Sequence, residues 1–96
     1  MRFKWDPVKA KLNSRKHGVC FSDACLVFQD PLVLSLPDLV HSIEEERWVS
    51  LGAAGPARLL VVVHTYRMRE GEEVVRIISA RSATTTERRH YRERTP

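Results

Sequence analysis

Polar and apolar positions alternate over the first five residues, which predicts a short strand, and the pattern then changes to that of a helix. The expected helix covers residues 6–18, where Asp6 is the N-terminal cap and Pro7 takes the first helical position. Gly18 ends it, because glycine readily adopts the left-handed conformation that closes many helices.

The middle of the chain predicts a further helix and several strands. "FSDACLVFQDP" indicates a shorter helix, capped by Ser22, with so little polar surface that it should pack tightly against a sheet. "LVLSL" is strand-like, and "EERWVSLGAAGPARLLVVVHTYR" predicts an antiparallel hairpin with its turn at 52–56. A second turn at "REGEE" leads to a third long strand, "VVRIISAR". Thr84 or Thr85 then caps a closing helix that has Glu87 in its first turn.

This order of elements predicts a single α+β domain over residues 1–96. We expect a small antiparallel sheet with two N-terminal helices and a C-terminal helix. The helices should cover one face of the sheet and leave the other face free to bind a ligand. A chain of this length has room for one modest core.

Charge is divided unevenly along the chain, whose formal net charge is +4. Residues 1–16 carry six basic side chains and one acidic side chain. Residues 76–96 carry six basic and two acidic side chains. Residues 17–75 carry four basic and nine acidic side chains, so the ends are basic and the middle is acidic. Basic ends suit an anionic ligand on one face, although a merely solubilising surface would have the same composition.

Composition also argues against several classes of protein. The longest apolar run, "LLVVV", is too short to cross a bilayer, and no signal peptide pattern precedes it, so we expect a cytoplasmic protein without a membrane partner. Cys20 and Cys25 have no His or Cys at zinc spacing and are expected to be reduced thiols. The four histidines share no ligand spacing, and we expect neither a metal ion nor another cofactor.

The remaining Arg, Lys, His and Glu side chains suit cleavage of an RNA phosphodiester without a metal ion. Attack by the ribose 2′-hydroxyl needs a base for its proton, an acid for the leaving 5′-oxygen and cations for the charge on phosphorus. Arginine suits the last role, because its planar fork donates two parallel hydrogen bonds to phosphate and stays charged. His or Glu can fill the first two roles.

Arg81 is the strongest candidate for holding a phosphate, because it ends the last strand directly before a helix cap. Its alternative role is that of a surface cation paired with Glu87. Arg76 lies five residues earlier, an odd offset, so a regular strand would place the two arginines on opposite faces and leave Arg76 a structural role. Only a bulge between them would bring both to one cleft.

Candidate bases lie in the segment before the hairpin. His41 is expected in a loop that contains Pro and Asp, where a reactive side chain can be displayed or simply hydrogen bonded. Glu46 belongs to the acidic run 44–46, which precedes Arg47 and would otherwise be a solvated strand end. His64 alternates within an apolar strand and is expected to be a half-buried structural residue.

Basic and aromatic side chains near the helix ends could also contact RNA. Lys16 and His17 lie in the last turn of the first helix, where they could reach a phosphate or only pair with the helix dipole. Arg88 and Tyr91 lie one turn apart on the last helix. There they could touch a phosphate and stack on a base, or pack against the sheet.

Four segments, taken together and in order, resemble one protein family. They are "FKWDPVKAKLNSRKHGVCF", "FQDPL", "HSIEEERWVSLG" and "VRIISARSATTTERRHY", which extend from about Phe3 to Tyr91. The chain resembles the BrnT toxins of bacterial type II toxin–antitoxin systems. The family's charged motif positions fall here on Lys16, His17, Glu46, Arg47, Arg76, Arg81 and Arg88.

The resemblance implies a RelE-like fold and a metal-independent endoribonuclease that blocks translation. It also implies neutralisation by a BrnA-like antitoxin with a ribbon-helix-helix part, so that promoter DNA is bound only through the antitoxin in a hetero-oligomer. On this chain the expected catalytic residues, which stabilise the phosphate or act as base, are Arg81, Arg47, Glu46 and His41. The expected RNA-binding residues are Lys16, His17, Arg76, Arg88 and Tyr91.

Two other classes of function fit the same residues. The chain could be a nucleic-acid-binding module without catalysis, which would retain RNA in a salt-sensitive manner and leave it intact. It could also be chiefly an interaction protein, which would bind the product of a neighbouring gene and have no affinity for RNA at physiological salt.

Overall fold

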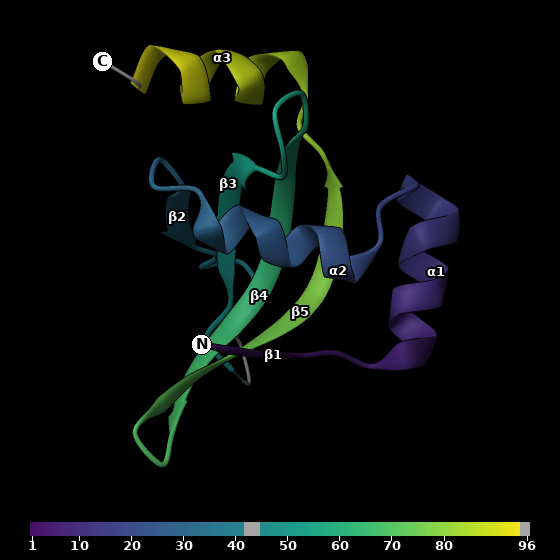
Figure 1. The fold of residues 1–96 in the computed structure, drawn as a ribbon, viewed down its shortest axis with the longest axis vertical. Helices are drawn as coiled ribbons and strands as arrows, with labels where there is room; N and C mark the ends of the chain where they lie inside the picture. The colour runs from purple at the N-terminus through teal and green to yellow at the C-terminus, as the bar shows by residue number, and fades with distance from the viewer. Residues whose placement is uncertain (42–44, 95–96) are drawn as a thin grey trace.

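The structure is a computed structural model that describes residues 1–41 and 45–94, and it confirms an α+β fold (Figure 1). In chain order, the described elements are β1 (Arg2–Lys4), α1 (Pro7–His17), α2 (Phe21–Ala24), the 3-10 helix η1 (Cys25–Gln29), β2 (Leu34–Pro37), β3 (Trp48–Ala53), β4 (Leu59–Arg69), β5 (Glu72–Ser82) and α3 (Thr85–Arg94). The strands form one sheet in the order β1-β5-β4-β3-β2.

Strands β2 to β5 form the antiparallel meander that the sequence predicts. The turn between β4 and β5 consists of Glu70 and Gly71, whose φ angles of 54° and 78° match a two-residue hairpin turn with left-handed residues. β1 differs from the prediction, because it lies parallel to β5 and makes the sheet mixed. Alternation along a strand predicts its two faces but carries no information about which neighbour it pairs with.

Helix α1 begins and ends where the sequence predicts. The Asp6 carboxylate accepts a hydrogen bond from the backbone N–H of Val8 at 2.8 Å, which satisfies a free donor at the start of the helix. Gly18 has a φ angle of 69°, and its N–H donates to the Ser14 carbonyl at 2.8 Å. The helix stands beside β5 at the edge of the sheet (Figure 1).

The second helix is shorter and tighter than predicted. It starts after Cys20, with no side-chain cap, and the Ser22 hydroxyl contacts the Cys20 thiol at 3.3 Å instead of capping the helix. After Ala24 it continues as the 3-10 helix η1. Close packing decides this geometry, since Ala24 and Val27 are fully buried and a Cβ on Gly52 of β3 would lie 2.8 Å from Val27 Cγ1.

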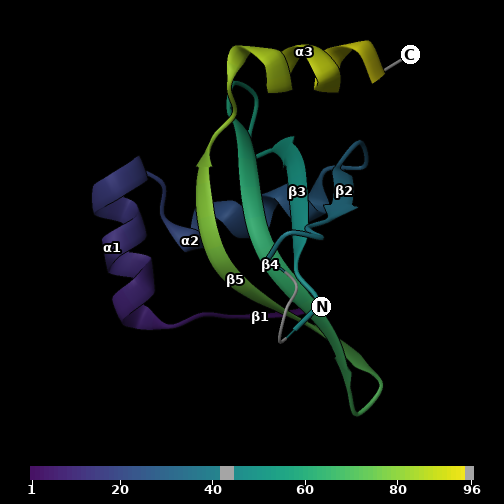
Figure 2. The same ribbon diagram turned by 180° about the vertical axis from the view of Figure 1, so that it is seen from behind.

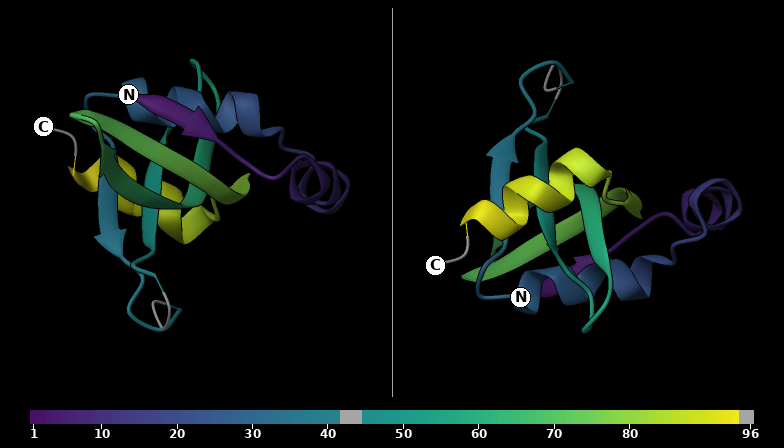
Figure 3. Two further views of the ribbon diagram at one scale, coloured as in Figure 1. Left: turned by 90° about the horizontal axis from the view of Figure 1, so that it is seen from below. Right: turned by 90° about the horizontal axis from the view of Figure 1, so that it is seen from above.

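The two faces of the sheet are covered unequally. α2 and η1 cross one face and enclose the main core, while Figure 2 shows the opposite face without a helix except α3 at one end. We call this opposite face the open face. α3 was expected beside the other helices, but it lies at the ends of β2 and β3 (Figure 3), where Tyr91 packs with Leu51 and Val61 of the open face. The short connection after β5 carries the chain to that side, and no local signal in the sequence marks the turn.

A bulge in β5 decides the positions of the two candidate arginines. β5 has one extra residue, Ile78, opposite the step from Val63 to His64 on β4. The extra residue shifts the alternation by one, so Arg76 and Arg81 lie on the same face in spite of their odd spacing. That face is the open face, and the expectation of opposite faces is corrected.

Candidate nucleic-acid interface

Basic side chains gather on the open face at the end away from α3. They line a cavity of about 110 Å³ and come from three adjacent strands; we call them the basic cluster: Lys4 of β1, Arg67 and Arg69 of β4, and Arg76 of β5. Strand pairing explains the gathering, because Lys4 lies directly opposite Arg76 and the two β4 arginines are two residues apart. Four cations on one concave surface create a site for an anion.

Among the described residues that line this cavity, Glu45 is the acidic one. Its carboxylate accepts a hydrogen bond from Arg76, and its second oxygen lies 3.6 Å from the Arg67 guanidinium. The side chain is 24% exposed, whereas that of the neighbouring Glu46 is exposed to solvent. The acidic run 44–46 indicated the segment that contacts the arginines, but the residue expected from it was Glu46 and not Glu45. Glu44 of that run lies outside the described residues.

Arg81 lies on the open face but is engaged by Glu87 of α3. Its two terminal nitrogens donate to the two carboxylate oxygens at 2.7 and 2.9 Å. Glu87 also accepts the backbone N–H of Thr84 at 2.8 Å, and the Thr84 hydroxyl accepts the N–H of Glu87 at 3.2 Å, a reciprocal cap. The hydrogen bonds from Arg81 lower the pKa of Glu87 to about 2. This pairing is the alternative that the sequence offered for Arg81, and it joins β5 to α3.

Tyr91 fixes α3 to the loop after η1. Its hydroxyl donates to the Asp30 carboxylate at 2.6 Å, and this bond raises the pKa of Tyr91 to about 12. Asp30 also accepts the backbone N–H of Ala53 at 2.8 Å, so the contact holds three segments together. Tyr91 and Arg88 line a separate cavity of about 370 Å³ beside the β3–β4 turn. The structure therefore places these two residues apart from the basic cluster.

The other predicted site residues divide between the loop and α1. His41 and Arg47 share with Glu45 the loop between β2 and β3, where the Arg47 carbonyl accepts the N–H of Asp38 at 2.8 Å. His41 Nδ1 lies 3.0 Å from the Asp38 carboxylate, and the histidine side chain is 65% exposed. Lys16 and His17, also exposed, end α1 on the outer side of β5 and do not line the cavity of the basic cluster.

His64 is structural, as the sequence predicts, and it is fully buried rather than half-buried. Its Nε2 lies 2.7 Å from the Ser50 hydroxyl, on the face of the sheet opposite the basic cluster. Burial lowers the pKa of the imidazole to about 4, so the ring is neutral at pH 7.

The described part of the chain shows neither a metal-binding cluster nor a membrane-spanning helix. Within residues 1–41 and 45–94, no three His, Cys, Asp or Glu side chains gather closely enough to hold a metal ion. In the same part, none of the helices combines the length and apolar character needed to span a membrane.

These features define a small α+β protein with a cationic sheet surface. Comparison with known proteins identifies its family. Residues 5–87 match a family model described as "Ribonuclease toxin, BrnT, of type II toxin-antitoxin system". The chain belongs to this family of toxins, whose membership implies an RNA target and an antitoxin partner.

A solved structure supports the same placement. The protein is similar to the Brucella abortus ribonuclease toxin BrnT, known from a crystal structure at 1.1 Å resolution, with 27% sequence identity and a TM-score of 0.65. The match covers 88% of this chain and 99% of the Brucella chain. Among curated proteins, none is similar enough to match.

Proposed function

We propose that this toxin is an endoribonuclease that cleaves RNA at the basic cluster without a metal ion. The observation that carries the proposal is the position of Glu45, whose carboxylate lies between Arg76 and Arg67 on the open face. A proton acceptor and the cations that a phosphate requires thus occupy one cavity.

The arginines hold the scissile phosphate in this mechanism. An RNA phosphate entering the cavity replaces Glu45 as the partner of the Arg76 hydrogen bond and of the Arg67 ion pair, because guanidinium groups bind phosphate oxygens well and can do so with two parallel hydrogen bonds. Lys4 and Arg69 add charge that stabilises the extra negative charge of the transition state. Glu45 then stands beside the phosphate with an unpaired carboxylate.

Glu45 is the base and His41 the acid in the proposed reaction. Glu45 takes the proton of the 2′-hydroxyl, the 2′-oxygen bonds to phosphorus, and the bond from phosphorus to the 5′-oxygen breaks with its electrons on oxygen. His41, in the same loop and oriented through Nδ1 by Asp38, gives that oxygen a proton from Nε2. The products are a 2′,3′-cyclic phosphate and a 5′-hydroxyl. The sequence offered Glu46 or His41 as the base; this proposal gives that role to Glu45 and makes His41 the acid.

The remaining features of the proposal follow from the family. We infer that cleavage blocks translation in the cytoplasm and that the antitoxin is BrnA-like, with a ribbon-helix-helix part. Promoter DNA is then bound only through the antitoxin, in a hetero-oligomer. The other residues that were expected as catalytic or RNA-binding do not line this cavity, and we keep them as candidates for RNA contacts outside it: Arg81, Arg47, Lys16, His17, Arg88 and Tyr91.

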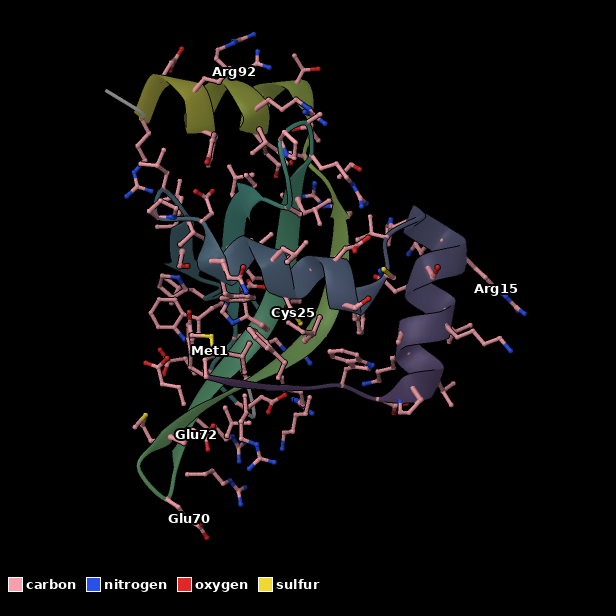
Figure 4. All side chains as sticks on the ribbon, viewed as in Figure 1. Met1, Arg15, Cys25, Glu70, Glu72 and Arg92 are labelled. Atoms are coloured by element: carbon pink, nitrogen blue, oxygen red, sulfur yellow. The ribbon has the colours of Figure 1, made fainter. Side chains whose placement is uncertain are left out.

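The proposal is tested by Arg76→Ala and a matched control, Arg15→Ala, in an assay of RNA cleavage by the purified chain. Arg15 is an exposed arginine on α1 that points away from the sheet (Figure 4). Arg76→Ala should lose roughly a hundredfold in kcat/KM, about 2.7 kcal/mol. Arg15→Ala should stay within about twofold. Equal losses in both variants, or none in either, would contradict a site at the basic cluster.

Glu45→Gln separates catalysis from binding. It should retain RNA affinity, because Arg76 and Arg67 remain, while cleavage falls by roughly a hundredfold or more. RNA that is retained but left intact by the parent chain would instead identify a binding module.

A further inference from the structure

The open face carries a second feature, an apolar groove between the sheet and α3, with a volume of about 200 Å³. We call it the α3 groove. Its sheet wall consists of Leu34 and Leu36 of β2, Val49 and Leu51 of β3, and Val61 of β4. Its helix wall consists of Thr86, Glu87 and His90. The mechanism above uses none of these side chains.

Exposed apolar side chains also occur on β2 and in the chain just after it. Leu36 is 58% exposed on β2, which is the last strand at that side of the sheet in the described part of the chain. Leu39 and Val40 follow it in the chain and are 83% and 77% exposed. Large apolar side chains that are exposed together beside an unpaired strand edge mark a surface that another protein covers.

The net charge of α3, the helix that forms one wall of the groove, favours an acidic occupant. α3 forms one wall, and it carries four arginines against two glutamates: Arg88, Arg89, Arg92 and Arg94 against Glu87 and Glu93. The charge of Glu87 is already balanced by Arg81. A second copy of this chain would bring like charges together, whereas a partner with carboxylates beside its apolar residues would be attracted.

The chemistry of the walls favours a peptide over a nucleobase. Proteins bind single-stranded bases by stacking them on aromatic rings or guanidinium planes. Among the described residues that line the α3 groove, the sheet wall offers only Leu and Val, and a single imidazole, His90, stands on the helix wall. Branched aliphatic side chains pack well against other aliphatic side chains, which an amphipathic segment of a protein supplies.

We propose that the α3 groove is the docking site of the antitoxin. A segment of the antitoxin places aliphatic side chains against Leu36, Val49 and Leu51 and directs carboxylates towards the arginines of α3. Because the groove and the basic cluster lie at opposite ends of one face, an antitoxin that extends from the groove along this face also covers the path of RNA and stops cleavage. The docking site rests on family membership, which implies an antitoxin, and the exclusion of RNA rests on the proposed function of the basic cluster.

The test compares Leu36→Glu with Leu12→Glu. Both leucines are 58% exposed, but Leu12 lies on α1, on the other side of β5. The probe is the purified BrnA-like antitoxin that the proposed function names, and its affinity for each folded variant is measured by calorimetry. Leu36→Glu should weaken binding by roughly a hundredfold, as for a central anchor residue, and Leu12→Glu should leave it unchanged.

RNA cleavage by the same variants without antitoxin provides the second measurement. Leu36→Glu should cleave within about threefold of the parent and should escape inhibition by the antitoxin. Unchanged antitoxin affinity in Leu36→Glu would overturn the docking site, whatever the cleavage rate. Loss of cleavage with unchanged antitoxin affinity would assign the groove to RNA. If Arg76→Ala cleaved RNA as well as the parent chain, the proposed catalytic site would be wrong. The effect of Leu36→Glu on antitoxin affinity would still decide the docking site.

Discussion

His64 has no exposed surface, yet its ring is part of a polar chain inside the apolar core. Nε2 lies 2.7 Å from the Ser50 hydroxyl, which lies 2.6 Å from the hydroxyl of Ser35. The rings of Phe28 and Tyr66 pack edge-on against the imidazole, with centroids 4.7 and 4.8 Å away. An imidazolium in this place would be desolvated, so the folded protein holds the ring neutral.

Stability should therefore fall in mild acid through His64. The pKa of the imidazole is about 4 in the folded chain against 6.5 for the ordinary group, so the unfolded chain takes up the proton first. The contribution is complete above pH 6.5 and is lost towards pH 4, up to roughly 3 kcal/mol. Urea unfolding from pH 7 to pH 4 should show a steeper loss for the parent than for His64→Gln. His90→Gln, a change at an exposed histidine, should keep the parent's slope.

Asn13 joins two elements by hydrogen bonds that the sheet itself cannot supply. Its amide donates to the carbonyls of Val19 and Ala80 at 3.0 and 2.9 Å, and its oxygen accepts the Ala80 N–H at 3.1 Å. β1 pairs only with residues 74–76 of β5, so on the side of β5 away from β4 no described strand lies beside Ala80. A single buried side chain, 7% exposed, thus closes the upper edge of β5.

Asn13→Ala should destabilise the fold by about 2–4 kcal/mol, because it leaves buried carbonyls and a buried N–H without partners. Ser14→Ala, the same kind of truncation at the next and exposed position of α1, should change stability by less than about 0.5 kcal/mol. Chemical denaturation of the three proteins at pH 7 gives both values. If Asn13→Ala lowered the free energy of unfolding by no more than Ser14→Ala does, the result would show that water replaces the lost hydrogen bonds.

Elements with local signals could be predicted from the sequence, and those set by distant contacts could not. The capped helix α1 and both hairpins follow from residues that act within a few positions of themselves, such as Asp6 and Gly71. The parallel pairing of β1, the bulge at Ile78 and the side that α3 takes depend on packing between segments far apart in the chain. The bulge matters most, because it turns Arg76 towards the open face.

At the scale of the whole molecule, the candidate site is an assembly of three strands and a loop. The sequence indicated the types of residue and the charge of the ends, but Glu45 and Glu46 are equivalent in a run of three glutamates, and only the folded loop distinguishes them. Arg81 looked stronger than Arg76 because of its position before a helix cap. In the structure, this position gives Arg81 a partner, because its guanidinium donates to Glu87. Arg76, by contrast, lines the cavity of the basic cluster.

The open face thus carries two surfaces of different character. One is the basic cluster, proposed to cleave RNA, and the other is the apolar α3 groove, proposed to bind the antitoxin. Both lie on one face, so under these proposals an antitoxin that extends from the groove along the face would exclude RNA from the cations.

Analysis of the ends of the cleaved RNA tests the central claim most directly. The purified chain is incubated with RNA in excess EDTA, beside the same RNA carrying one 2′-deoxy nucleotide at the cleavage position. The account predicts cleavage in EDTA, a 2′,3′-cyclic phosphate and a 5′-hydroxyl at the new ends, and no cleavage at the 2′-deoxy position. Activity that EDTA abolishes, or cleavage that continues at the 2′-deoxy position and leaves a 5′-phosphate, would contradict it.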